Sequence, residues 1–463
     1  MDRSIHATPG PRLLRWALFG LVVLAFATGG SAQISGWDDT VVQLLSLPVL
    51  ALALWHLGRQ PMPLPMRLAL AAAGMVILVP LLQLLPIPSG LWLLPDAREA
   101  LGRDLAAVGV IPDHRWSLAP AASERAFLFL LPPLAAFLAT LSTGFEDHRK
   151  LLRLVMLLAM TSLLLGFVQL GVPEESLLNP YPRWNGLFNG LFANRNHQGI
   201  SVVIALIIAE AGALVALGSV RQGLREAWTP WVLGFVALFA LCALPLTGSR
   251  AAVLIAVFAV ATVPMALGLF DAAHLRGSWA ARVGLVACVA LIALGAWATL
   301  GWMQVEAVDE VRPLLRSASL AVGFEHAPLG AGVGAFVPAF EQGAGPDLLL
   351  RQYINHAHNE YLQWWVEAGW LGMLVLLAVL ATLAVVGMRA LQERGARRVP
   401  GLVALMGLGA LLLHSWVDYP MRTVSLATVA AVLAGIVVAQ AVRARPRGGM
   451  VPVGEAGTAS HTF

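Results

Sequence analysis

The chain has 463 residues, of which 58% are hydrophobic and only 12% are charged, roughly half the charged share of an ordinary soluble domain. This composition excludes a soluble globular protein and favours a membrane protein. The net charge of +4 does not indicate a nucleic-acid partner, because the arginines lie in short loops between apolar runs, where membrane orientation explains them.

Apolar runs of about 17 or more residues recur along the chain, and each is long enough to cross roughly 30 Å of hydrocarbon as a helix. We predict an all-α polytopic membrane protein with about twelve transmembrane helices in a single membrane domain over residues 1–463. The first run is interpreted as a signal anchor rather than a cleaved signal peptide. The expected spans are residues 12–30, 41–58, 68–86, 124–142, 150–171, 199–218, 229–245, 250–270, 282–301, 361–389, 400–416 and 421–442.

Charge in the loops predicts the orientation of these spans, since Lys and Arg accumulate on the cytoplasmic side. One alternate set of loops is rich in arginine and includes both chain ends, the second being a flexible tail at 443–463. We therefore expect both termini in the cytoplasm. The opposite set contains long connections near 87–123, 172–198 and 302–360. These would face the periplasm of a bacterial inner membrane, and long loops commonly carry binding and catalytic residues.

The connection at 302–360 is the longest, and we expect it to form part of the catalytic region between the ninth and tenth spans. Its segment "VEAVDEVRPLLRSASLAV" has apolar residues at helical intervals and predicts an amphipathic helix on the outer interface. The following "PLGAGVGAF" lacks the lysine ending of a phosphate-binding loop. It is interpreted as a flexible turn before an extended segment.

The end of this connection, "YINHAHNEYLQ", places His356 and His358 next to the tenth span. Histidine is the side chain whose charge changes most readily near neutral pH. One interpretation is that both are interfacial residues with ordinary hydrogen bonds. Zinc binding through H-x-H is another, but no thiolate lies near and a third ligand would have to come from elsewhere. We predict no metal site.

Several segments, taken in order, resemble the O-antigen ligase and O-antigen polymerase superfamily of bacterial inner membranes. His358-Asn359 is followed by nine residues and then by Gly369 and Gly372, which is similar to a histidine motif of the ligases. Three further segments resemble the family and carry Asn194, Arg195 and Asn196 in "NGLFANRNHQGI", Arg250 in "LTGSRAAVL", and Asp418 in "HSWVDYPMRTVSLATVAAVLAG". The resemblance extends over about residues 185–440.

The resemblance implies a glycosyltransferase that needs no metal or cofactor. It would move a glycan from an undecaprenyl diphosphate carrier to an acceptor hydroxyl at the periplasmic face. The acceptor is lipid A-core for a ligase and a carrier-linked glycan for an O-antigen or exopolysaccharide polymerase; the histidine spacing favours the ligase. His358 would be the general base, since a free imidazole pKa of about 6.5 suits that role. Residues expected to support it are His356, Asn194, Asn196, Asn359 and Asp418.

Arg195 and Arg250 are expected to bind the donor diphosphate. Arginine remains charged and can bind phosphate oxygens bidentately, and a helix that begins near Arg250 directs its positive dipole end to the same layer. The alternative is that each guanidinium only reaches lipid headgroups. The asparagines have an alternative as helix caps, and Asp418 as a solvated turn residue.

Membrane lipids are expected partners of the protein whatever its function. A transporter is the competing class of function. Transporters place ionisable groups near the middle of the bilayer on broken helices, often in two related halves. Here the polar residues gather at the outer ends of the expected spans, and the two halves of the sequence do not resemble each other. We therefore favour the enzyme.

Overall fold

The computed structural model describes residues 12–32, 37–181, 188–223, 226–268, 307–345 and 354–444, together with Trp279, Trp297, Gly301 and Leu348. Within these residues the chain is helical and contains no β-strand. The predicted all-α class is confirmed for this part of the chain. The expected span at 282–301 and the tail beyond Ala444 lie outside the described residues.

Nine helical segments in the described ranges are long and apolar enough to cross a membrane, and each coincides with an expected span. Two other expected spans are 17-residue helices, α1 (Arg12–Thr28) and α11 (Arg250–Ala266). At 1.5 Å per residue each is about 25 Å long, a little short of a typical hydrocarbon core. The chain is a multi-pass membrane protein, while the count of twelve spans stays a prediction.

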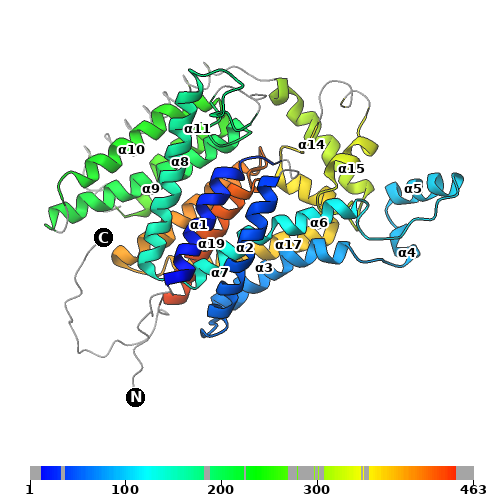
Figure 1. The fold of residues 1–463 in the computed structure, drawn as a ribbon, viewed down its shortest axis with the longest axis horizontal. Coiled ribbons are helices and arrows are strands. Elements are labelled where there is room, and N and C mark those ends of the chain that lie inside the picture. Colours follow the sequence, from blue (N-terminus) through cyan, green and yellow to red (C-terminus); the bar gives the residue numbers. More distant parts are fainter. Residues whose placement is uncertain are drawn as a thin grey trace.

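The centre of the molecule is formed by α1, α2 (Trp37–Leu57), α7 (Leu131–Leu141) and α19 (Val424–Arg443), which pack against one another (Figure 1). Small residues let these helices approach closely, as in other membrane bundles. A Cβ added to Gly435 of α19 would lie only 2.7 Å from Thr140 Cβ of α7. The close packing makes α19 a rigid support for the turn that precedes it.

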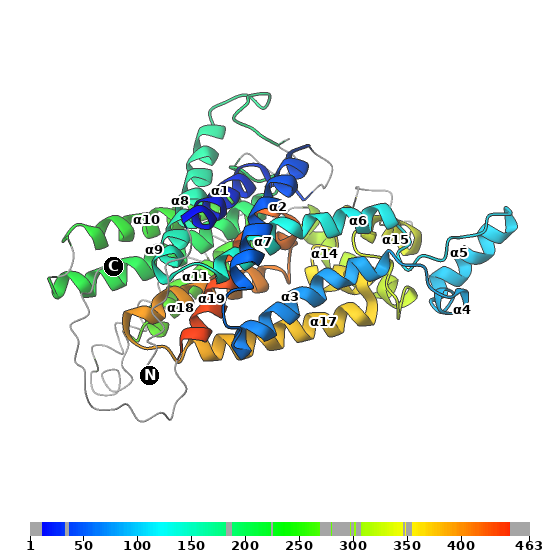
Figure 2. The same ribbon diagram turned by 60° about the horizontal axis from the view of Figure 1, so that its bottom comes forward.

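Two groups of helices flank this centre (Figures 1 and 2). One group contains α8 to α11, and α18 packs between α9 and α19. On the other side α3 and α17 run side by side, and α14 and α15 pack near the start of α17. The remaining bounds are α3 (Leu64–Gln83), α4 (Ser89–Trp92), α5 (Asp96–Ala107), α6 (Pro120–Phe129), α8 (Phe145–Gln169), α9 (Arg195–Arg221), α10 (Thr229–Ala243), η1 (Leu244–Thr247), α14 (Ala307–Glu325), α15 (Phe336–Gly343), α17 (Glu360–Ala390), η2 (Gly395–Arg398), α18 (Val399–His414) and η3 (Pro420–Arg422).

The amphipathic helix expected in the long connection is α14, and part of its apolar face packs against protein, whereas Leu320 and Phe324 are exposed. Leu315 and Val322 are buried in a cluster with Phe336 and Phe340 of α15. The extended segment predicted after the glycine-rich turn is wrong, because α15 begins there at Phe336. Phe336 and Phe340 are four residues apart, so a helix places both on the buried face.

Two of the long connections are tied together by a buried arginine. Arg98 of α5 is fully buried, and its Nη2 donates to the carbonyl oxygens of Trp116 at 2.5 Å and Gly330 at 2.7 Å. The backbone N–H of Leu118 also donates to the carbonyl of Ala331 at 2.8 Å. The region 87–123 thus braces the loop that leads from α14 to α15.

Candidate active site

Residues far apart in sequence meet where several helices begin or end. Helix α9 begins at Arg195 and α11 at Arg250, whereas α18 ends at His414 just before Asp418. A pocket of about 30 Å³ is lined by Arg195, Asn196, Gly248, Arg250, Ala251, Arg312, His414, Val417 and Asp418. The two arginines and the aspartate singled out in the sequence therefore share one pocket.

Asp418 is fully buried and is contacted by several other residues of this region. The amide of Asn196 donates to its Oδ2 at 2.5 Å, and the amide of Asn194 lies 3.4 Å from its Oδ1. The backbone N–H of Tyr419 donates to Oδ1 at 2.9 Å. A buried carboxylate needs such donors, because an unpaired buried charge is strongly disfavoured. The donors fix Asp418 as a charged group rather than a solvated turn residue.

Two histidines and an arginine also face Asp418. Nδ1 of His358 lies 3.5 Å from Oδ1, Nε2 of His197 lies 3.8 Å from Oδ1, and Nη2 of Arg312 lies 3.9 Å from Oδ2. Burial alone would raise the pKa of Asp418, but the hydrogen bond and charge of His358, with His197 and Arg312, hold that pKa well below its usual range. The carboxylate is ionised at neutral pH.

His358 has a left-handed backbone conformation, with φ of 47°, which is uncommon for a residue other than glycine. The turn is held on its C-terminal side by Asn359, which caps α17 by accepting hydrogen bonds from the N–H groups of Tyr361 and Leu362 at 3.0 and 3.1 Å. Asn359 also donates to the carbonyl of Trp416 at 3.0 Å. Strained backbone of this kind concentrates at functional sites.

His356 lies behind the cluster rather than against Asp418. Its ring packs on Tyr419 with centroids 4.0 Å apart, and its Nδ1 lies 3.1 Å from Nε2 of Gln363. Burial and then the charge of Arg422 lower the pKa of His356 well below its usual value. His356 is therefore neutral at neutral pH and shares a hydrogen bond with the amide of Gln363. It is a support for Tyr419, whose ring also contacts the imidazole of His358 at 4.9 Å.

A buried ion cluster lies beneath His356. Arg422 pairs with Glu360 at 3.2 Å and with Glu367 at 2.9 Å, and Gln363 donates to Glu367 at 3.1 Å. Burial opposes the charge of Arg422, but Glu367 and Glu360 raise the pKa of its guanidinium above the ordinary value. The cluster joins the first two turns of α17 to the segment just after Asp418, so it fixes the His358 turn relative to the carboxylate.

Arg195 and Arg250 occupy the first positions of α9 and α11. Asn194 caps α9 by accepting from the N–H of Asn196 at 2.8 Å, so the cap interpretation holds alongside its contact with Asp418. A Cβ added to Gly248, which has φ of +70°, would lie 2.6 Å from Nη1 of Arg195. Two helix N-termini, three arginines and one carboxylate give the pocket a net positive field, which suits an anionic ligand.

The two glycines of the histidine motif shape α17. Gly369 has φ of +56° and interrupts the helix, and the N–H of Trp370 donates to the carbonyl of Pro328 at 3.0 Å. A Cβ at Gly369 would lie 2.3 Å from that carbonyl oxygen, and one at Gly372 would lie 2.9 Å from Nε1 of Trp364. Glycine is therefore required at position 369, where the loop after α14 crosses the kinked helix, and at position 372 to leave room for Ala368 and Trp364 of α17 itself.

Arg312, His197, His414 and Tyr419 also belong to the cluster, although the sequence analysis did not single them out. His197 lies in the quoted segment around Asn194, and His414 and Tyr419 lie in the segment around Asp418. Arg312 stands on the polar face of the predicted amphipathic helix, and its Nη1 donates to the carbonyl of Val417 at 2.9 Å. Charged residues on an amphipathic helix are usually solvated, so the spacing of the residues does not predict that Arg312 belongs to the cluster.

Metal ligation was a further possibility for the histidines. Among the described residues, no group of three or more His, Cys, Asp or Glu side chains is arranged to hold a metal ion. Asp418 and the three arginines offer charge and hydrogen bonds instead.

Fold and site together define a multi-pass helical membrane protein with a cationic pocket at the ends of its helices. Residues 235–377 match the family model described as O-antigen ligase, and no curated protein matches the chain. The match covers about a third of the chain and confirms the predicted resemblance there: residues 235–377 are similar to the O-antigen ligase family. Such enzymes act in general on a lipid-linked glycan and an acceptor. The matched range includes Arg250, Arg312 and the histidine motif, but neither Arg195 nor Asp418.

Proposed function

We propose that the protein is a glycosyltransferase that moves a glycan from an undecaprenyl diphosphate carrier to an acceptor hydroxyl at the periplasmic face of the bacterial inner membrane. The observation that carries the proposal is the position of His358 against buried Asp418, which also lines the pocket of Arg195, Arg250 and Arg312. The family match supports this reaction class. The residues of the candidate active site lie at helix ends rather than in mid-span, which argues against a transporter.

The arginines would bind the donor diphosphate. A lipid diphosphate holds its charge at the interface while its prenyl tail stays in hydrocarbon, and guanidinium groups bind phosphate oxygens bidentately. The pocket of about 30 Å³ has the volume of roughly one water molecule. We therefore expect the diphosphate to bind at the mouth of the pocket, with an outward shift of α14 and Arg312.

His358 would act as general base. Its Nδ1 faces Asp418, which leaves Nε2 to accept the proton of the acceptor hydroxyl. The acceptor oxygen then attacks the anomeric carbon, and the bond from that carbon to the diphosphate oxygen breaks with its electron pair leaving on the diphosphate. The configuration inverts. Asp418 would orient the imidazole and stabilise its protonated form, as carboxylates do in other catalytic dyads.

The other predicted residues would act through these groups. Asn194 and Asn196 hold the Asp418 carboxylate, Asn359 holds the His358 turn, and His356 supports Tyr419. We propose them as positioning residues. The reaction described above does not require any of these residues to contact the substrate.

Acceptor identity separates ligase from polymerase. Purified protein would be incubated with an undecaprenyl diphosphate glycan and either lipid A-core or a second carrier-linked glycan. Glycan gained by lipid A-core is expected for the ligase, which the histidine spacing favours. Extension of the carrier-linked glycan would identify a polymerase instead. Transfer to neither acceptor by folded protein would overturn the proposed function.

Metal independence is tested separately. In this mechanism arginines neutralise the charge of the leaving diphosphate. Electrostatic stabilisation by these fixed groups takes the place of a metal ion. Transfer should therefore persist in excess EDTA. Loss of transfer in EDTA that Mg²⁺ or Zn²⁺ restores would contradict this part of the proposal.

A further inference from the structure

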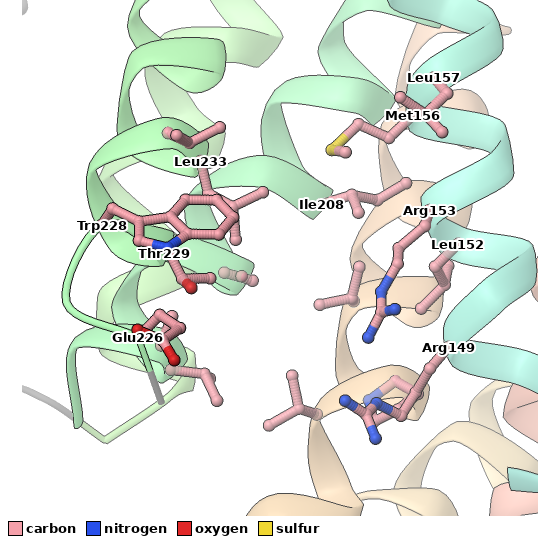
Figure 3. A pocket seen from close by; sticks show the side chains of 18 of the residues that line it. Arg149, Leu152, Arg153, Met156, Leu157, Ile208, Glu226, Trp228, Thr229 and Leu233 are labelled. Carbon is pink, nitrogen blue, oxygen red and sulfur yellow. The ribbon is translucent and has the colours of Figure 1, made fainter. Parts of the chain in front are cut away.

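A second and larger cavity, of about 780 Å³, lies between α8, α9, α10 and the start of α18 (Figure 3). Its α9 residues, from Ile208 to Ala216, are 13 or more residues beyond Arg195, which is about 20 to 30 Å along the helix. Its α18 residues, Val399 and Val403, are at the opposite end of that helix from His414. The cavity therefore lies toward the membrane face opposite the candidate active site.

One face of α8 forms a wall of this cavity and changes from charged to apolar. Arg149, Leu152, Arg153, Met156 and Leu157 line it at spacings that place them on one helical face. The change from guanidinium to thioether and aliphatic groups takes eight residues, or about 12 Å of helix. This gradient matches the step from headgroup to hydrocarbon in one leaflet.

The facing wall has the same gradient. Glu226, Trp228 and Thr229 stand at the polar end, and Leu233 of α10 lies deeper. Figure 3 shows the guanidinium groups of Arg149 and Arg153 on one side of the open space and Glu226 and Thr229 on the other. Both walls therefore place polar groups at one end of the cavity and apolar groups at the other.

The rim of the cavity is apolar and exposed. Leu157 is 58% exposed, Trp228 61% and Val232 49%. Exposed apolar side chains on a membrane protein face lipid, and tryptophan is enriched at the membrane interface. The cavity is thus open to a lipid that enters sideways from the bilayer.

We propose that this cavity binds one phospholipid with an ethanolamine-type head group. The lipid phosphodiester would contact Arg149 and Arg153, its ammonium group would contact Glu226, and an acyl chain would lie against Met156 and Leu233. Basic pockets between transmembrane helices are known sites for lipid head groups, and the volume is in the range of about 300–1,000 Å³ typical of small-molecule sites.

Charge at the mouth favours a zwitterionic head group over an anionic one. Arg149 is paired with Glu146 at 3.0 Å, and Glu226 adds a second carboxylate opposite Arg153. The charged residues that line the cavity are thus two guanidinium groups and one carboxylate, and the charge of Arg149 is already paired with Glu146. A head group that carries one charge of each sign can contact both walls at once.

The test uses the full-length protein in mild detergent with defined lipids. Native mass spectrometry would measure bound phosphatidylethanolamine and phosphatidylglycerol of the same acyl composition, each titrated separately. Arg153→Gln removes one phosphate contact, and Val232→Trp narrows the exposed rim. Arg394→Gln is the matched control, because Arg394 is an exposed arginine in the loop before α18 and lies outside the cavity.

Both cavity variants should weaken ethanolamine-lipid binding by about tenfold, equivalent to roughly 1.4 kcal/mol, while the control binds like the wild type. The wild type should bind the ethanolamine lipid more tightly than the glycerol lipid. Absence of a bound lipid, equal affinity for both lipids, or the same loss in the control would each overturn the proposal. The cavity residues are separate from the candidate active site, so this outcome does not depend on the proposed reaction.

Discussion

Replacing Asp418 with asparagine removes one charge from the candidate active site with almost no change in volume. His358 Nδ1 then faces an amide instead of a carboxylate at about the observed 3.5 Å. A hydrogen bond to a charged group contributes about 1.5–3 kcal/mol, and each 1.36 kcal/mol in the activation barrier changes a rate tenfold. We expect kcat to fall by about 10- to 150-fold.

The assay is the initial rate of glycan transfer at saturating donor, with the donor KM measured in parallel. Asp113→Asn is the control, because that carboxylate is 83% exposed and pairs only loosely with Arg115 at 3.7 Å. Thermal unfolding at the assay pH separates loss of folded protein from loss of rate. A kcat within twofold of the wild type, or an effect confined to donor KM, would refute the role of Asp418 in orienting His358.

The pH dependence of this variant follows from the depressed pKa of Asp418. A carboxyl group with a lowered pKa in the folded state contributes stability above its unfolded pKa of about 3.9, and that stability is lost as pH falls through the folded value. Asp418 is therefore ionised throughout the range from about pH 5 to 9. Titration of Asp418 itself should therefore not change the size of the Asp418→Asn deficit within that range.

Three further results are expected. Arg195→Ala or Arg250→Ala should raise the donor KM by about 10- to 150-fold, and lysine should restore affinity only in part because it lacks the bidentate fork; an unchanged KM in both would remove them from donor binding. Gly248→Ala should reproduce the Arg195→Ala defect, since its Cβ would meet that guanidinium, whereas Gly234→Ala, with open space around it, should have no effect on donor KM. His356 has a lowered pKa in the folded protein, so as pH falls the unfolded state binds a proton first, and the stability of the folded state should decrease below about pH 6.5. His356→Gln should make the decrease of melting temperature with falling pH shallower. An unchanged slope would contradict a buried, neutral His356.

Helices and several site residues were predictable because their signals are local. Apolar runs of sufficient length define spans, and Asn194 and Asn359 stand at helix starts where their caps are found. The histidine motif also pointed to glycines whose backbone the structure explains. The sequence alone does not show that Gly369 interrupts the helix, because the reason is the loop at Pro328 that crosses there.

What could not be predicted depends on contacts between distant segments. Arg312 comes to Asp418 because α14 folds back onto the start of α17, and no spacing in the sequence encodes that approach. The helix after the glycine-rich turn has only eight residues, Phe336–Gly343, which is too short for its spacing to predict a helix. It was recognised only once Phe336 and Phe340 were found in the buried cluster with Leu315. The number of spans also could not be predicted from hydropathy, because α1 and α11, with 17 residues each, are close to the minimum length for crossing a membrane.

Glycan transfer by His358→Ala protein tests the central claim most directly. Wild-type and variant proteins, purified at equal folded fraction, would be given the same undecaprenyl diphosphate glycan and acceptor. A positioned general base contributes about 10²- to 10⁴-fold to rate, so the variant should transfer at least about 100-fold more slowly with donor binding retained. Transfer near the wild-type rate would contradict the account.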